Sequence, residues 1–271
     1  MRLSTLNRLW SALHHGMAGI WIRRPIQTLA RAMGWILAIA LALLVFTEAV
    51  AFGANLRGKR KAEGLLREVR SLRVGPSTSA DVEPIVRRYG AEPAIASSSD
   101  CPGAAQSYSI WTANRMLNLL SMRYPLLDRV GLRPAGASAM ILLEAERVCL
   151  VYFGVGSRKT AAGEYLEAST TLTRAADDPH LEGLQYAVHI SRVRDTRRIA
   201  VIVGPAASVE QFQHAFDYDF SCLTRFQGCQ AVCEFMPSAW LDYQRYRRTH
   251  GWELSPEEAG DPYCKKLGAL P

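Results

Sequence analysis

The cysteines are the residues of this sequence whose chemistry is most constrained by their placement. An even number of them, all on one side of a single hydrophobic segment, is typical of disulfides formed in an oxidising compartment. We therefore predict disulfides, with the C-terminal region stapled to itself and one pair reaching across the main sheet. The six candidates are Cys101, Cys149, Cys222, Cys229, Cys233 and Cys264, of which we expect the first two to pair.

A metal site is the competing interpretation of the same residues. Four of the cysteines follow residue 220 and, together with His214, contain enough soft ligands for zinc. Zinc ribbons and fingers use short hooks of the form Cys-x-x-Cys, and this spacing occurs nowhere in the chain. The sequence thus predicts no metal site, and free buried thiols remain a further alternative.

A glycine-rich string from Gly154 to Thr160 ends in Lys-Thr, like a phosphate-binding loop. However, Arg158 stands where such a loop has the glycine that precedes its lysine. A strand-like run follows, without the helix whose N-terminus would bind phosphate, so we expect a flexible Gly/Ser hairpin loop. No Gly-x-Ser-x-Gly or His-Glu-x-x-His pattern occurs either, and we predict no catalytic residue and no cofactor.

An aromatic and basic cluster near the C-terminus is the candidate ligand surface. Such a surface binds sugars or peptides through ring stacking and guanidinium hydrogen bonds. At helical spacing the same rings also pack against a core, and this alternative stays open. The candidate residues are Trp240, Tyr243, Tyr246, Arg247 and Trp252.

The elements that must position these residues indicate an α+β fold. Alternating apolar residues predict a hairpin over residues 140–153, a strand over 165–173 and a second hairpin over 186–203. A capping box at Ser208 begins one helix, and another is expected from Ser238 to His250. We predict a meander of about five antiparallel strands, flanked by helices and followed by a disulfide-stapled C-terminal region.

Ahead of this domain lies a stretch that is long and apolar enough to cross a bilayer as a helix. Residues 33–54 contain one charged residue, Glu48, and have basic flanks. A cleavable signal peptide is the alternative, because Ala49-Val50-Ala51 fits the pattern before a cut. We favour a membrane anchor, since residues 1–32 form an unusually long leader for a signal peptide.

The net charge of +7 is concentrated around that apolar stretch. Residues 1–32 carry five arginines and no acid, and a short basic tail resists translocation, so we place the N-terminus in the cytosol. The bases of residues 55–74, counted alone, would favour the opposite orientation, but a long domain translocates largely regardless of charge. From residue 75 onward acids slightly outnumber bases, which excludes nucleic acid as an expected partner.

The predicted organisation is a basic cytosolic tail (1–32), a transmembrane helix (33–54), a juxtamembrane helical stalk (55–74) and an extracytoplasmic α+β domain (75–271). We expect a single-pass protein of the bacterial envelope that contacts the lipid bilayer and serves as a non-catalytic binding or structural module. An envelope protein or a glycan is the expected ligand. Two alternatives stay open. One is an extracytoplasmic enzyme whose site is built from scattered residues, and the other is a cytosolic domain with reduced cysteines that binds metal.

Overall fold

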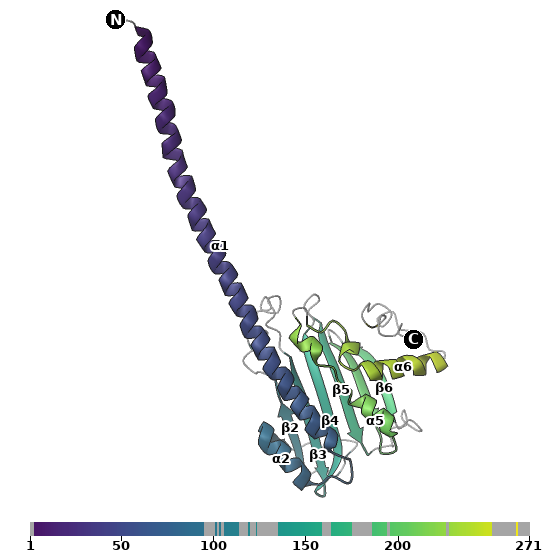
Figure 1. Ribbon diagram of the computed structural model, residues 1–271. Coiled ribbons are helices and arrows are strands. Elements are labelled where there is room, and N and C mark those ends of the chain that lie inside the picture. The colour runs from purple at the N-terminus through teal and green to yellow at the C-terminus, as the bar shows by residue number, and fades with distance from the viewer. Residues whose placement is uncertain are drawn as a thin grey trace. The chain divides into compact units, whose positions relative to one another are not determined.

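The computed structural model describes residues 3–94, 101, 103, 106–113, 119, 123, 135–158, 164–174, 186–193, 196–225, 228–250 and 264. Within them the chain forms a seven-stranded sheet, in the order β1-β2-β3-β4-β5-β7-β6, with helices before and after it (Figure 1). The fold is thus α+β, as predicted. The strands are β1 (Glu92–Ala94), β2 (Gln106–Trp111), β3 (Ala135–Glu144), β4 (Arg147–Arg158), β5 (Tyr165–Thr173), β6 (Tyr186–Val193) and β7 (Thr196–Val203). The helices are α1 (Leu3–Ser71), α2 (Ser79–Tyr89), α5 (Val209–Ala215) and α6 (Pro237–His250), with the short 3-10 helices η1 (Ser221–Thr224) and η2 (Val232–Glu234).

The prediction of an entirely antiparallel sheet is wrong at one pairing. Strand β7 lies parallel to β5, with Leu166 opposite Arg197 and Leu172 opposite Val203. The other pairings between described strands are antiparallel. After β5 the chain forms β6 at the sheet edge and then returns as β7 between β5 and β6. The alternating apolar pattern of β7 could not reveal this pairing. One face of the strand is buried whether it runs parallel or antiparallel to its neighbour.

Both predicted hairpins are present, formed by β3 with β4 and by β6 with β7. The β3–β4 turn uses Ala145 and Glu146, whose φ angles of 49° and 61° are uncommon for residues other than glycine. The flexible loop expected at Gly154 is wrong, because β4 continues to Arg158 and stays paired with β5. Strands β1 and β2 were not predicted.

One face of the sheet forms the core of the protein. On four neighbouring strands, Ile141, Val151, Leu172 and Val203 stand in one row and are buried. They alternate with residues on the opposite face, as the two-residue period of a strand requires. The same core cluster includes residues of α1, α2, α5 and α6, so these helices pack on one face of the sheet (Figure 1).

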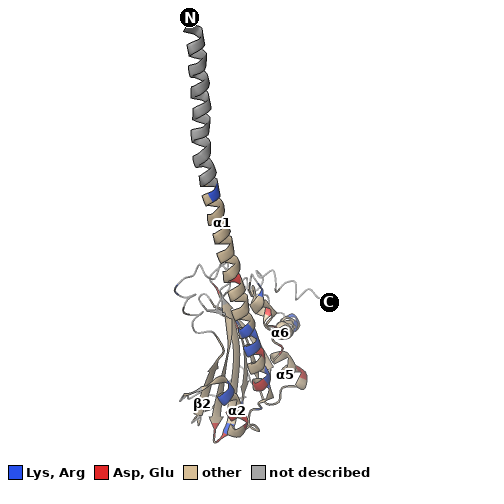
Figure 2. Ribbon diagram, turned by 60° about the vertical axis from the view of Figure 1, so that its left-hand side comes forward, with Lys and Arg blue, Asp and Glu red and all other residues tan. Residues whose placement is uncertain are grey.

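The N-terminal part of α1 is long and apolar enough to cross a membrane. From Arg31 onward it contains a strongly apolar stretch, almost none of which is buried. Large apolar side chains such as Trp35, Leu41 and Phe46 are exposed there. In Figure 2 the ribbon of α1 carries one blue, basic position at the start of this stretch, and blue positions begin again further along the helix. A signal sequence at this position would meet the same criteria of length and composition.

The chain divides inside α1 into two compact units, Met1–Ala49 and Val50–Pro271. In the second unit the end of α1 belongs to the core. Ala62, Leu65 and Val69 follow one another at helical spacing and are fully buried. The segment expected as a stalk therefore supplies the first helix of the globular core.

The six cysteines form three pairs at disulfide distance, and none is free. The expected pair across the sheet is present, and the C-terminal region is stapled to itself. These pairs suggest an oxidising compartment. They are Cys101–Cys149, Cys222–Cys229 and Cys233–Cys264, with Cα–Cα distances of 6.0, 4.7 and 5.7 Å.

Replacing Leu65 by alanine tests whether the end of α1 belongs to the core. The variant should lose about 2–5 kcal/mol in the free energy of unfolding, because a fully buried leucine leaves a cavity. The matched control is Arg67→Ala, an exposed position on the same helix, which should change it by about 0.5 kcal/mol or less. Urea unfolding of the full chain in lipid nanodiscs, followed by tryptophan fluorescence, gives both values. If both substitutions changed the free energy of unfolding equally little, the end of α1 would not pack on the sheet.

Candidate functional site

The face of the sheet opposite the core carries a concavity of about 390 Å³, which we call the sheet groove. It spans β2 to β5, at the end of the sheet where β3 and β5 begin. Its volume lies within the range of ligand pockets in proteins. Its floor and walls include Trp111, Gly136, Met140, Gly154, Gly156 and Tyr165.

Glycines form the floor of the sheet groove. Gly136 on β3 pairs with Gly156 on β4, and Gly154 lies two residues earlier on β4. Two tyrosines occupy the space above β4, since a Cβ atom at Gly154 would collide with the phenol of Tyr152, and one at Gly156 with that of Tyr165. The missing side chains therefore allow both aromatic rings to lie along the sheet.

A row of polar contacts borders the groove. Tyr152 donates a hydrogen bond to Glu167 Oε1 at 3.0 Å, and Arg198 Nη2 lies 2.9 Å from Glu167 Oε2. Burial raises the pKa of the Tyr152 phenol, and the neighbouring Glu167 carboxylate raises it further. The phenol therefore stays protonated and donates its proton to Glu167, while its oxygen can still accept a hydrogen bond.

A β-bulge connects the groove to one of the cysteine pairs. The pairing of β3 with β4 shifts register between Leu142 and Leu143, which leaves Cys149 as the extra residue. Cys149 then lies with Cys101 in a small buried cluster, and the groove residue Tyr152 packs against that cluster. The cysteine pair is thus in contact with the groove through Tyr152.

Two aromatic side chains at the groove are exposed. Trp111 is 73% exposed and Tyr165 is 39% exposed. Trp111 lies at the end of β2, beyond Ser109, the last residue of β2 that pairs with the short strand β1. Single exposed apolar residues are common, but two large exposed rings beside the same cavity make it the candidate ligand surface.

A second cluster of polar residues joins α5, α6 and β6. Asp242 Oδ2 lies 2.7 Å from His214 Nδ1 and accepts a hydrogen bond from the Tyr186 hydroxyl at 3.0 Å. Arg245 lies 3.6 Å from the other carboxylate oxygen. Burial raises the pKa of the Tyr186 phenol, with a further contribution from the charge of Asp242. A carboxylate that orients a histidine also occurs in hydrolases, where the histidine acts as the base.

The described residues do not complete a hydrolytic site around this histidine. Among the described residues, no serine, threonine or cysteine forms a hydrogen bond with His214. The residues that line the two described cavities also do not include it. The contacts of Asp242 instead hold α5 and α6 to the edge strand β6.

The structure buries two of the five residues predicted to form a ligand surface. Trp240 and Arg247 are each 3% exposed. Tyr243 packs against both, with its ring centroid 5.9 Å from that of Trp240 and 5.6 Å from the guanidinium carbon of Arg247. Tyr246 is half-buried, and Trp252 lies outside the described residues. The three contacting side chains thus serve packing in this part of the chain.

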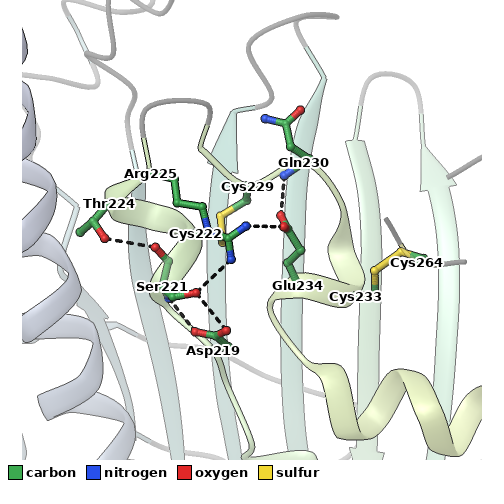
Figure 3. A network of polar contacts seen from close by, with 10 residues as sticks. All are labelled: Asp219, Ser221, Cys222, Thr224, Arg225, Cys229, Gln230, Cys233, Glu234 and Cys264. Carbon is green, nitrogen blue, oxygen red and sulfur yellow. Dashed lines mark hydrogen bonds and ion pairs between the residues drawn. A yellow bond between two sulfur atoms is a disulfide. The ribbon is translucent and has the colours of Figure 1, made fainter. Parts of the chain in front are cut away.

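A network of polar contacts lies beside the paired cysteines of the C-terminal region (Figure 3). Arg225 Nη1 lies 2.6 Å from Glu234 Oε1, and the other carboxylate oxygen accepts a hydrogen bond from the Gln230 N–H at 2.7 Å. The pair Cys222–Cys229 closes the loop that carries Arg225. In the described part of the chain, no group of three or more His, Cys, Asp or Glu side chains is arranged to hold a metal ion.

The residues of the sheet groove were not predicted from the sequence. The alternation of glycine with larger residues at Gly154 and Gly156 was a usable signal, because glycine inside a strand often marks a close approach. The sequence around Trp111 did not predict a groove, because the other groove residues lie on other strands.

No known protein family, no curated protein and no solved structure matches this chain. The candidate site therefore rests on its own geometry.

Replacing Asp242 by alanine tests whether the His214 cluster is structural. The variant should lose about 1.5–3 kcal/mol in the free energy of unfolding, since His214 and Tyr186 lose a charged hydrogen-bond partner. The control is Arg245→Ala, which removes a long contact from a largely exposed side chain and should cost about 0.5 kcal/mol or less. Urea unfolding as above compares the two, and similar small losses would argue against a structural role.

Proposed function

We propose that this chain is a single-pass membrane protein whose globular domain lies outside the cytosol and binds a glycan of the cell envelope. In this proposal α1 crosses the bilayer with residues 33–54, and the N-terminus stays in the cytosol. An apolar helix of sufficient length and three cysteine pairs at disulfide distance support this placement. The five arginines of residues 1–32 support the orientation.

The observation that carries the binding function is the exposure of Trp111 and Tyr165 beside the sheet groove. Burying a large apolar side chain contributes roughly 1.5–3 kcal/mol. A domain that leaves two aromatic rings exposed at one cavity forgoes that stabilisation until a ligand covers them. The groove therefore has the features of a binding site, with apolar rings and a few fixed polar groups.

A glycan fits the groove better than a peptide strand does. The floor strands β3 and β4 lie inside the sheet, and their backbone groups pair with neighbouring strands, so they cannot pair with a peptide backbone. A sugar ring offers an apolar C–H face that stacks on aromatic rings. Its hydroxyl groups can hydrogen-bond with the polar lining residues Ser109, Ser138 and Glu167.

A hydrolase is the second candidate, favoured by the 2.7 Å contact between His214 and Asp242. It is the weaker candidate, because that contact lies away from the sheet groove and lacks a described nucleophile. A hydrolase would shorten the bound glycan, and His214→Ala would abolish the shortening without abolishing binding.

Thiol counting tests the compartment. In membrane fractions, all six cysteines should react with an alkylating reagent after denaturation and reduction, and none after denaturation alone. The control variant Cys101→Ser should leave its partner, Cys149, as the one thiol that reacts without reduction. Mass spectrometry of the alkylated protein reads both results. Reaction of all six cysteines without reduction would place the domain in the cytosol.

Sedimentation with purified insoluble peptidoglycan tests the ligand. The full chain in nanodiscs should sediment with this polymer, and Trp111→Ala or Tyr165→Ala should weaken its binding about tenfold, as loss of a central aromatic contact typically does. The control is Val209→Ala, which removes an exposed apolar side chain away from the groove. If the wild-type chain stays in solution, or if all three variants bind alike, the groove is not a peptidoglycan site.

A further inference from the structure

A second cavity, of about 350 Å³, lies in the globular unit beside α5, and we call it the crevice. It shares no lining residue with the sheet groove. Its walls are mainly aliphatic, and Val209 at its side is 76% exposed, although the side chain is apolar. The apolar walls include Val74, Leu172, Val203, Pro205, Val209 and Phe212.

The crevice lies where the two parallel strands end. Because β5 and β7 run in the same direction, their last residues, Thr173 and Val203, lie at the same end of the sheet. From there the chain continues from β5 towards the edge strand β6, and from β7 towards α5. In open sheets, ligands commonly bind outside the carboxyl ends of parallel strands, where the connections diverge.

Arg73 brings a positive charge to this apolar cavity. Its guanidinium carbon lies 3.9 Å from the ring centroid of Phe212, a cation–π contact that holds the charge at the wall. The side chain is exposed, and no carboxylate among the described residues forms an ion pair with it. An anionic group would complement this charge.

The other polar side chains of the crevice, Ser208 and Thr173, already have partners. Ser208 accepts a hydrogen bond from the N–H of Gln211 at 3.1 Å, and its own N–H donates to the Gln211 side chain at 2.8 Å. Thr173 also has a polar contact. A bound peptide would find few side-chain partners for its amide groups, and burying unpaired amides is unfavourable. An alkyl chain has no such requirement.

We infer that the crevice binds a medium-chain fatty acid, with the alkyl chain against Val203 and Phe212 and the carboxylate on Arg73. Arginine suits this role because its planar guanidinium can hold a carboxylate with two parallel hydrogen bonds. This site is separate from the sheet groove, so it does not depend on glycan binding.

Photo-crosslinking with a diazirine derivative of decanoic acid tests the site. The full chain is reconstituted in phosphatidylcholine nanodiscs, labelled and digested with trypsin. One tryptic peptide, residues 199–225, contains the β7–α5 part of the crevice, and another, residues 32–57, contains the apolar stretch of α1. The ratio of label in the first peptide to label in the second corrects for probe that only partitions into the bilayer. The corresponding diazirine alcohol serves as the uncharged probe.

The ratio obtained with the carboxylate probe should fall about tenfold in Arg73→Gln, because a charge-assisted hydrogen bond is lost. Arg73→Lys should keep part of it, and Ala207→Phe should lower it by filling the crevice. Trp111→Ala, a change in the sheet groove, should leave it unchanged. An unchanged ratio in Arg73→Gln, or equal labelling of residues 199–225 by the alcohol probe, would overturn the inference.

Discussion

The described helices of the globular unit all pack on one face of the sheet, and both cavities follow from this arrangement. The end of α1, α2 and α6 bury Leu65, Val82 and Trp240 in the same core cluster. The sheet groove lies on the opposite face, where Trp111 and Tyr165 are exposed. The crevice forms at the rim of the core, where α5 meets the ends of β5 and β7.

Side-chain contacts and a cysteine pair stabilise the face of the sheet opposite the core. Tyr152 lies over Gly154 and reaches Glu167, so one side chain shields the backbone and ends in a hydrogen bond. The bulge at Cys149 brings its sulfur to Cys101, and this pair links positions 48 residues apart. Such a link restricts the unfolded chain, which stabilises the folded one. The groove can therefore leave its aromatic rings exposed without losing its shape.

A buried polar contact attaches the C-terminal region to the centre of the sheet. The Thr170 hydroxyl hydrogen-bonds with the Ala215 carbonyl and with the Tyr218 hydroxyl, the latter at 3.0 Å. The Tyr218 ring meets Phe153 edge to face at 5.1 Å, and burial raises the pKa of this tyrosine, which keeps it neutral. These contacts hold the end of α5 on the sheet. They thereby position Phe212, the ring against which Arg73 lies in the crevice.

By itself the sequence determined the features that depend on neighbours along the chain. Alternating apolar residues predicted both hairpins, the apolar run predicted the long N-terminal helix, and an even number of cysteines predicted their pairing. Tertiary structure alone decided that β7 joins β5 in parallel, that Trp111 and Tyr165 flank one groove, and that His214 meets Asp242. The physical reason is that these contacts join segments far apart in the sequence, and their residues fit the local pattern equally well with other partners.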